Sequence, residues 1–298
     1  MMRTTLLMLL LVLIASFSSG CIRNDTVSSD GVLQVAVTIP PLKEMVEVIG
    51  GDRVSVTVVV PPGSEPHTFE PGPGLISRIS RSDIFFRVGE GLFPFEDQLV
   101  GRLSSQNHRL RIVDLSHGID LILMDDHHDC GQDHGDAGYD PHIWLSPVNG
   151  GVMAESIAES LIMLDPDGEA FYRENLAEYH QAIMETDTRL REDLTDLRIR
   201  RFIVTHDAWG YFAREYGLEQ IAVFVGGKEP TARDIAEIVR IAREDEIPII
   251  FVEPQFSQKT AEVIAAEADA MVIVINPLAE GYLSNFVHVA ESLEEAMR

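Results

Sequence analysis

Histidines are the residues of this sequence whose chemistry is easiest to identify, and three of its ten histidines share one setting. His67 follows the apolar run 56–60, His142 lies in the segment DPHIW, and His206 ends the run RFIVTH, so each lies at or just after the expected end of a β-strand. In open α/β sheets, ligands bind outside the carboxyl ends of the strands, so residues roughly 65 to 75 positions apart can converge there. A single histidine in such a place is more often structural. Because neutral imidazole is a common transition-metal ligand, however, three of them predict a metal site.

A second group of metal-ligating side chains lies in the polar loop 125–138. It contains five aspartates together with His127, His128, Cys130 and His134. Imidazole, thiolate and carboxylate all bind zinc, so this loop is expected to collect zinc weakly. The alternative is a solubilising acidic loop, because a composition this charged cannot bury a core. Cys130 is either a soft zinc ligand or a bystander thiol.

The elements that must position these side chains alternate along the chain. Strands are expected at 34–37, 53–60, 84–88 and 109–113, and then at 202–205, 220–225, 249–252 and 271–275. Helices are expected at 42–49, 148–164, 208–216, 231–245 and 258–268. Strands that alternate with helices indicate βαβ units and mostly parallel sheets. The prediction is an α/β fold with two similar lobes.

One long helix is expected between the two lobes. From Tyr172 to Leu197, apolar residues recur three, four or seven positions apart, which is typical of an amphipathic helix. Asp167 is its expected N-cap, and roughly 28 residues at ~1.5 Å each give about 40 Å, enough to support both lobes. A coiled-coil partner is the alternative explanation of the apolar stripe. A rigid helix shared by both lobes would limit their closure to small tilts.

The first residues have the pattern of an export signal. Arg3 precedes an apolar run too short to cross ~30 Å of hydrocarbon, and small residues precede Cys21. This end of the signal resembles the lipobox of exported lipoproteins, although Ser18 stands where that pattern usually has Leu. We expect residues 1–20 to be a signal peptide, Cys21 to be lipidated, and residues 21–31 to form a polar tether. An ordinary cleaved signal and an uncleaved anchor helix are the alternatives.

The charge of the chain argues against nucleic acid as a partner. Lys and Arg number 23 against 48 Asp and Glu, which gives a formal net charge of -25 at pH 7, so phosphate backbones would be repelled. With 45% hydrophobic and 24% charged residues, the composition is that of a globular protein. Its 298 residues suit one large or two medium domains.

The sequence resembles the zinc and manganese substrate-binding lipoproteins of ABC transporters. This resemblance covers residues 32–298 and rests on six segments in order, PPGSEPHTFEP, DPHIWLSP, THDAWGYFAREYGL, EPTARDIAEIV, FVEPQFSQKTAEVIA and INPLAEGYLSNF. Members of that family have two α/β lobes joined by a rigid helix, and they hold one transition-metal ion in the cleft between them. The resemblance therefore implies an N-terminal lobe at 32–165, a linking helix at 166–198 and a C-terminal lobe at 199–298.

Carried over residue by residue, the resemblance implies that His67, His142 and His206 are metal ligands. The family usually has an acidic fourth ligand, and the matching position here is Asn276. Three possibilities stay open for the fourth position, namely a bound water, weak coordination by Asn276, or approach of Glu280. Because imidazole suits zinc whereas manganese prefers oxygen, we expect Zn²⁺ rather than Mn²⁺. The zinc-specific branch resembles this chain in carrying a His- and Asp-rich loop just before the second ligand.

The implied function is that of an extracytoplasmic receptor rather than an enzyme. It would capture Zn²⁺ and deliver it to a cognate ABC permease and its ATPase, as a monomer on the outer face of the cytoplasmic membrane or in the periplasm. A manganese-binding member and an adhesin or metal buffer of the same family are alternatives. A zinc hydrolase is a further alternative, because three histidines and a water also form catalytic zinc sites, but the sequence lacks HExxH.

Overall fold

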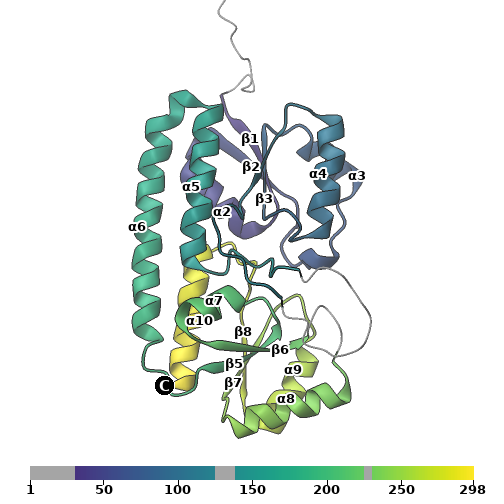
Figure 1. Ribbon diagram of the computed structural model, residues 1–298, viewed down its shortest axis with the longest axis vertical. Helices are drawn as coiled ribbons and strands as arrows, with labels where there is room; N and C mark the ends of the chain where they lie inside the picture. The colour runs from purple at the N-terminus through teal and green to yellow at the C-terminus, as the bar shows by residue number, and fades with distance from the viewer. Residues whose placement is uncertain (1–30, 125–137, 225–229) are drawn as a thin grey trace, which may run out of the picture.

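The computed structural model describes residues 31–124, 138–224 and 230–298, which form two α/β lobes (Figure 1). Each lobe contains a four-stranded sheet, and all strand pairs in the described part of the chain are parallel. In Figure 1 the first lobe lies above the second, and one long helix runs beside both. The predicted fold class is therefore confirmed.

The first sheet has the strand order β2-β1-β3-β4. Its strands are β1 (Leu33–Val37), β2 (Val54–Val58), β3 (Ile84–Arg87) and β4 (Arg111–Asp114). The helices of this lobe are α2 (Pro40–Gly50), α3 (Pro73–Ile79), α4 (Pro94–Gln106) and α5 (Pro147–Leu164), with short 3₁₀ helices η1 (Gly51–Arg53) and η2 (Pro66–Thr68). β3 is buried at every position, as expected of a central parallel strand covered on both faces.

The second sheet has the equivalent strand order β6-β5-β7-β8. Its strands are β5 (Arg201–His206), β6 (Glu219–Phe224), β7 (Ile249–Val252) and β8 (Met271–Val274). Its helices are α7 (Gly210–Tyr216), α8 (Ala232–Glu244), α9 (Gln258–Ala268) and α10 (Tyr282–Met297). The first strand of each lobe thus lies between the second and third strands, so both lobes have one topology.

Helices α3, α4 and α10 are absent from the sequence-based prediction. In α4 the reason is visible, because Glu96 is fully buried at a position where an amphipathic helix would have an apolar residue. That carboxylate interrupts the apolar stripe by which helices are recognised. Glu96 lies in the first lobe close to the site described below.

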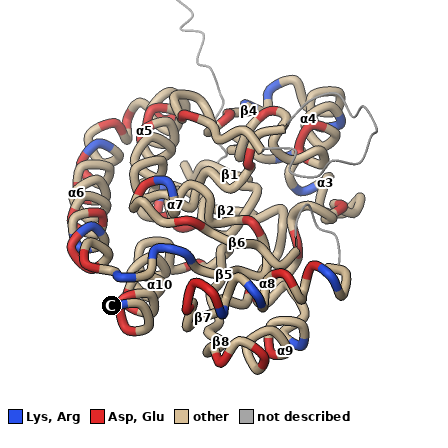
Figure 2. Tube along the Cα trace, turned by 60° about the horizontal axis from the view of Figure 1, so that its bottom comes forward, with Lys and Arg blue, Asp and Glu red and all other residues tan. Residues whose placement is uncertain are grey.

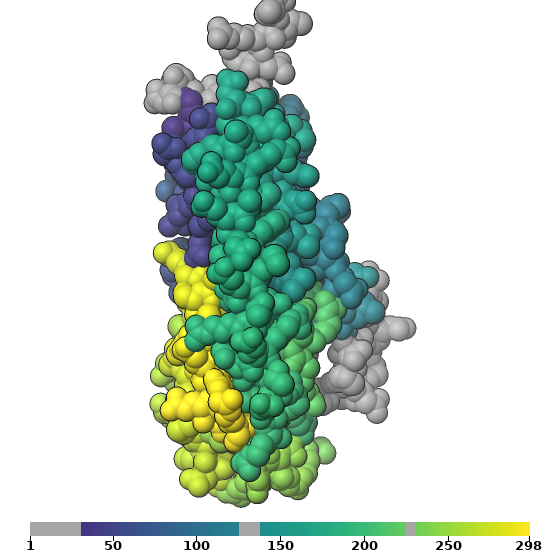
Figure 3. Space-filling view, turned by 90° about the vertical axis from the view of Figure 1, so that its left-hand side faces the viewer, coloured from purple at the N-terminus to yellow at the C-terminus, as the bar shows by residue number. Residues whose placement is uncertain are grey.

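The linking helix is α6 (Glu169–Asp193), with 25 residues. It packs against α2 and α5 of the first lobe and against α10 of the second. Figure 3 shows it running down one face of the molecule, with the C-terminal helix in yellow beside its lower half. The prediction that Asp167 is its N-cap is wrong, because the short 3₁₀ helix η3 (Pro166–Gly168) contains Asp167 and leaves Gly168 as the N-cap.

Tyr282, the first residue of α10, ties the second lobe to the first. Its backbone N–H donates to Glu44 Oε2 at 2.7 Å, and its hydroxyl lies 2.8 Å from the carbonyl oxygen of Trp144 and 3.0 Å from that of Ser146. The indole N–H of Trp144 donates in return to the carbonyl oxygen of Pro277 at 2.8 Å. These buried bonds fix the backbone that follows His142, so they hold one wall of the site in place.

Gly150 in α5 leaves the space that the Tyr282 hydroxyl occupies. A Cβ at Gly150 would lie 2.4 Å from that oxygen, so Gly150→Ala is expected to lower the free energy of unfolding by about 1 to 3 kcal/mol through overpacking. Gly151→Ala is the matched control, because its Cβ would meet nothing closer than 3.9 Å and alanine favours a helix. Urea unfolding of both variants tests this. Equal stability of the two would contradict the assigned role of Tyr282.

Acidic residues are spread over both lobes rather than gathered on one face (Figure 2). A uniform negative surface favours the approach of cations in general and marks no single docking face. Within the described ranges, no helix combines the length and the apolar character that a membrane crossing requires.

Candidate metal centre

The structure brings His67, His142 and His206 together at the junction of the lobes. His67 lies in η2, which follows β2, and His206 is the last residue of β5. The prediction that His142 lies at a strand end is wrong, because it lies in the irregular segment between β4 and α5. The Nε2 atoms of His67 and His142 are 3.2 Å apart, and one ring nitrogen from each histidine lies within 4.8 Å of the others. In the described part of the chain, this is the only cluster of three or more His, Cys, Asp or Glu side chains with metal-ligand spacing.

Two buried carboxylates orient two of these rings. Asp140 Oδ1 lies 2.7 Å from His142 Nδ1 and also accepts the backbone N–H of His142 at 2.9 Å. Glu253 Oε2 lies 3.4 Å from His206 Nδ1. Because each of these carboxylates faces Nδ1, the Nε2 atom of each ring points to the cluster, although Asp207 Oδ1 also lies 3.4 Å from His206 Nε2.

Glu253 is itself held by the second lobe. It is 1% exposed, its Oε1 accepts the indole N–H of Trp209 at 3.3 Å, and its backbone N–H donates to Thr205 Oγ1 at 3.1 Å. A carboxylate this buried requires partners, and here they are the indole of Trp209 for Oε1 and the facing ring of His206 for Oε2, which within the described residues has no hydrogen bond of regular geometry. The sequence analysis did not identify Glu253 as a site residue. The one sequence signal for it is its position directly after β7, in the segment VEP.

The three histidines differ in how readily they take up a proton. Burial, and then the positive charges of its two neighbours, lower the pKa of His67 well below its ordinary value. Burial likewise lowers the pKa of His142. Burial also opposes charge on His206, but the hydrogen bond and the negative charge of Glu253, together with the charges of Asp207 and Glu65, outweigh it and raise the pKa of His206 above its ordinary value. Two of the rings are therefore already neutral at neutral pH, as metal binding requires.

Aromatic rings surround the cluster. Phe93 meets His67 edge-on with ring centroids 5.1 Å apart, and Phe256 stacks on His206 at 5.0 Å. The ring of Trp144 lies 5.3 Å from that of His142. Such a shell restricts water and lowers the local dielectric constant, which strengthens the interactions of a bound cation.

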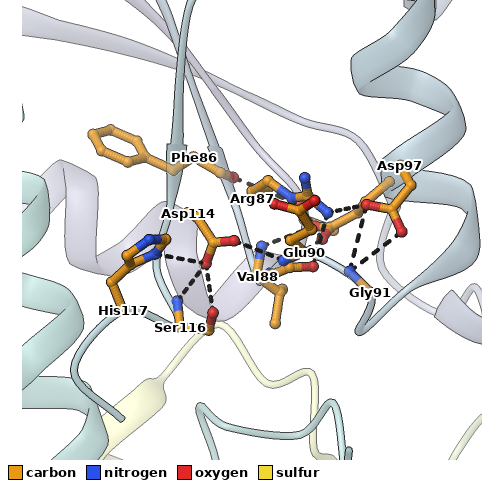
Figure 4. Close-up of polar contacts among 12 residues, drawn as sticks. Phe86, Arg87, Val88, Glu90, Gly91, Asp97, Asp114, Ser116 and His117 are labelled. Carbon is orange, nitrogen blue, oxygen red and sulfur yellow. Dashed lines mark hydrogen bonds and ion pairs between the residues drawn. The ribbon is translucent and has the colours of Figure 1, made fainter. Parts of the chain in front are cut away.

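The loop 88–93, which carries Phe93, is fixed by carboxylates. Its backbone N–H groups donate, over 2.7 to 3.5 Å, to Glu96, Asp97 and Asp114. Figure 4 shows Asp97 and Asp114 on opposite sides of this loop. Burial raises the pKa of Glu96 to about 7. The wall beside His67 is thus supported by polar bonds rather than by apolar packing alone.

A cavity of about 10 Å³, room for one water, lies between the lobes beside His142 and His206, and His67 is not part of its lining. Its lining comes from both lobes and consists of Glu65, Pro66, His142, Trp144, His206, Glu253, Gln255, Phe256, Pro277 and Leu278. A larger cavity of about 280 Å³ lies away from the histidines, beside the end of α6, and is lined largely by residues that already pair with one another.

The two candidate side chains for the fourth position do not join the histidines. Asn276 Oδ1 already accepts hydrogen bonds from Gln255 Nε2 at 3.2 Å and from the backbone N–H of Leu278 at 3.0 Å. Glu280 is exposed, and its charge acts on Glu44. Neither residue lines the cavity. Glu65 is closer, since its Oε1 lies 4.0 Å from His67 Nε2, although it is not part of the histidine cluster.

The remaining predicted site residues lie outside the described residues. These are the lipidation candidate Cys21 and the loop residues His127, His128, Cys130 and His134.

Comparison with known proteins relates the chain to metal-uptake proteins. The family model described as ZnuA, zinc-uptake complex component A periplasmic, matches residues 35–296. A solved structure described as ZnuA superposes with a TM-score of 0.83 at 36% identity, covering 90% of this chain and all of that one.

Three curated relatives agree with that match. The zinc uptake protein ZnuA of Bacillus subtilis is 30% identical over 90% of this chain and 85% of its own length. The manganese-binding lipoprotein MntA of Halalkalibacterium halodurans is 30% identical over 82% of this chain and 79% of its own length. The zinc-binding lipoprotein AdcA of Streptococcus pneumoniae is 28% identical over 91% of this chain, but the chain spans only about half of AdcA, 54% of its length.

Proposed function

The chain belongs to the ZnuA family of periplasmic zinc-uptake components, and on this premise we propose that it is the solute-binding component of an ABC transporter. It captures one Zn²⁺ ion between its lobes and delivers the ion to a membrane permease. The linking helix and the Tyr282 contacts hold both lobes around that site, so capture requires only a small movement.

The observation that carries this proposal is the convergence of three imidazole nitrogens from two lobes. His67 and His142 come from the first lobe and His206 from the second, so an ion bound by all three joins the lobes. Asp140 and Glu253 orient two of the rings from behind, as buried carboxylates do at zinc sites. Burial raises the pKa of Glu253 and raises that of Asp140 to about 7, and in their ionised forms both carboxylates supply the negative charge that three neutral imidazoles lack.

Zinc is the proposed cargo because of the donor atoms. Three imidazoles form the cluster, with Asp207 Oδ1 as a neighbour 3.4 Å from His206 Nε2, and a donor set made mainly of imidazole suits zinc better than manganese. The manganese-binding relative makes manganese the second candidate. Membership of an uptake family supports transport over hydrolysis.

We place the protein outside the cytoplasm, in agreement with a family described as periplasmic and with relatives named lipoproteins. In this proposal Cys21 carries the lipid anchor and the mature chain acts as a monomer. The permease and its ATPase are the proposed partners.

Zinc stoichiometry tests the proposal and separates the cleft from the loop. Protein purified without added metal is expected to contain zinc, and titration should give one tight site and further weak ones. Deleting residues 125–137 should remove the weak equivalents and leave the tight site, because the loop contains none of the three clustered histidines. The deletion is easy to close, since the backbone N–H of Met124 donates to the carbonyl oxygen of Gly138 at 2.9 Å.

Elemental analysis and competition with a zinc chelator measure both quantities. A full-length protein without a stoichiometric zinc site would refute the proposed function. Loss of the tight site together with the loop would instead refute the separation of the two sites.

A further inference from the structure

Gln255 places a polar atom without a partner beside the histidine cluster. Its Oε1 is buried, and in the described part of the chain no donor contacts it. Gln255 lines the same small cavity as His142 and His206. A buried carbonyl oxygen without a hydrogen bond is unfavourable, and native proteins retain such groups mainly where a ligand will satisfy them.

The orientation of this amide is determined by its neighbours. The backbone N–H of Leu278 can only donate, so the Asn276 side-chain atom that it contacts at 3.0 Å must be the oxygen. The Gln255 atom that faces the same oxygen at 3.2 Å must then be the NH₂ group. Asn276 is in turn anchored, because its backbone carbonyl oxygen accepts a hydrogen bond from Asn285 Nδ2 at 2.9 Å. Gln255 Oε1 is therefore held away from Asn276 as an acceptor.

A zinc ion bound by three imidazoles has one further position in its tetrahedron, and a water there offers two hydrogens. Glu65 lines the same cavity from the first lobe, and its Oε1 lies 4.0 Å from His67 Nε2. Its other oxygen accepts the backbone N–H of Thr68 at 3.2 Å, which fixes the carboxylate. Gln255 and Glu65 thus present one acceptor from each lobe.

We propose that Gln255 Oε1 accepts a hydrogen bond from a water that completes the coordination of the bound ion, with Glu65 accepting from its other hydrogen. This rests on the proposed function and assigns Asn276 a new role, as the positioning residue of Gln255 rather than as a ligand. The water is then held in place through hydrogen bonds to both lobes, so it can be bound in this way only when the lobes are closed around the ion.

Gln255→Leu tests the proposal through two measurements. Its zinc affinity should fall about 10- to 100-fold, the usual effect of removing a group that supports a metal ligand. In the Co²⁺-loaded protein, azide should replace the water and shift the visible absorption bands. Azide donates no hydrogen bond, so its binding gains nothing from the acceptor Gln255 Oε1, whereas the water that it replaces does. The Gln255→Leu variant should therefore require less azide than the wild type for the same spectral shift.

Three controls separate this role from general damage to the fold. Gln258→Leu makes the same change at an exposed position at the start of α9 and should leave zinc affinity and the azide response as in the wild type. Asn276→Asp keeps an acceptor for Gln255 but adds a carboxylate where the family usually has its acidic ligand, so it should bind zinc more tightly and respond less to azide than the wild type. Asn276→Ala frees the amide and should behave in part like Gln255→Leu.

The outcomes identify which idea fails. A wild-type Co²⁺ spectrum that does not respond to azide, or a Gln255→Leu variant with wild-type zinc affinity and azide response, would overturn the role of Gln255. Parallel weakening of zinc and azide binding in Gln255→Leu would indicate a structural role and would also overturn it. Absence of any stoichiometric cleft metal in the wild type would refute the proposed function itself.

Discussion

His206→Ala is expected to weaken zinc binding in the cleft by more than about 100-fold, because loss of a group that merely supports a ligand already reduces affinity 10- to 100-fold. This variant removes the ligand from the second lobe, so the ion no longer joins the two lobes. It also leaves the buried carboxylate of Glu253 without the partner that faces it at 3.4 Å. Competition titration with a zinc chelator measures the effect.

His180→Ala is the matched control, since the ring of His180 contacts the carbonyl oxygen of Gly151 at 3.1 Å and takes no part in the cluster. Its zinc affinity should be that of the wild type. His67→Ala and His142→Ala should resemble His206→Ala. If all three cluster variants kept wild-type affinity, the tight site would have to lie elsewhere in the chain.

The convergence of the histidines was predictable in part, because ligand-binding residues gather beyond the carboxyl ends of parallel strands. His67 follows β2 and His206 ends β5, but these strands belong to different sheets and His142 follows no strand, so the packing of the two lobes completes the cluster. The period of the apolar runs was sufficient to place the strands within a few residues. It was sufficient as well for the linking helix, whose buried stripe includes Tyr172, Tyr179 and Leu190.

The groups around the histidines were not predictable in the same way. Glu253 faces His206 because β7 lies beside β5, with Val204 paired to Phe251. Strand order depends on which crossover packs on which face, and the apolar pattern of a single strand does not contain that information. The same holds for Gln255 and Asn276, which meet through the loops that follow β7 and β8.

The start of the linking helix was predicted wrongly from local sequence because tertiary contacts determine it. Asp167 has the chemistry of an N-cap, yet it lies inside a 3₁₀ turn and the helix begins two residues later. Asp165 accepts instead from the hydroxyl of Tyr172 at 2.7 Å and from the guanidinium of Arg53 at 2.7 Å. These contacts fix the turn, so the entry into the helix is determined by packing rather than by its cap.

The zinc affinity is expected to fall by about ten- to 100-fold per pH unit once the pH drops below the pKa values of His206 and of Asp140, which is raised to about 7, because zinc displaces up to one proton from each; above them it should be nearly constant. The direction of this pH dependence follows from the protonation of the three histidines in the folded protein without metal. His67 and His142 have lowered pKa values, so they are already neutral near pH 6.5 and zinc displaces no proton from them. His206 has a raised pKa, so it carries a proton below a pH somewhat above 6.5, and zinc must displace that proton.

The slope distinguishes this arrangement from three ordinary histidines. If all three rings titrated near their usual pKa of about 6.5, affinity would fall up to about 1000-fold per pH unit at low pH, one factor of ten for each proton. Competition titrations between pH 5 and pH 8 measure the slope. Calorimetry in buffers of different ionisation enthalpy counts the released protons, and release of three or more at pH 6 would contradict the assignment, because only His206 and Asp140 have a proton to lose there.

Glu253→Gln should change the pH profile in a direction that simple damage to the site would not produce. Without the negative charge of Glu253, only the weaker effects of Asp207 and Glu65 oppose the burial of His206, so its pKa should fall and the region of constant affinity should extend to lower pH. At pH 8 the same variant should bind zinc about 10- to 100-fold more weakly, because the ring loses the group that orients it. An unchanged profile would mean that Glu253 does not set the proton affinity of His206. Weaker zinc binding at pH 8 together with a smaller loss of affinity in acid would therefore show that Glu253 increases the affinity of the site and also makes that affinity more sensitive to acid.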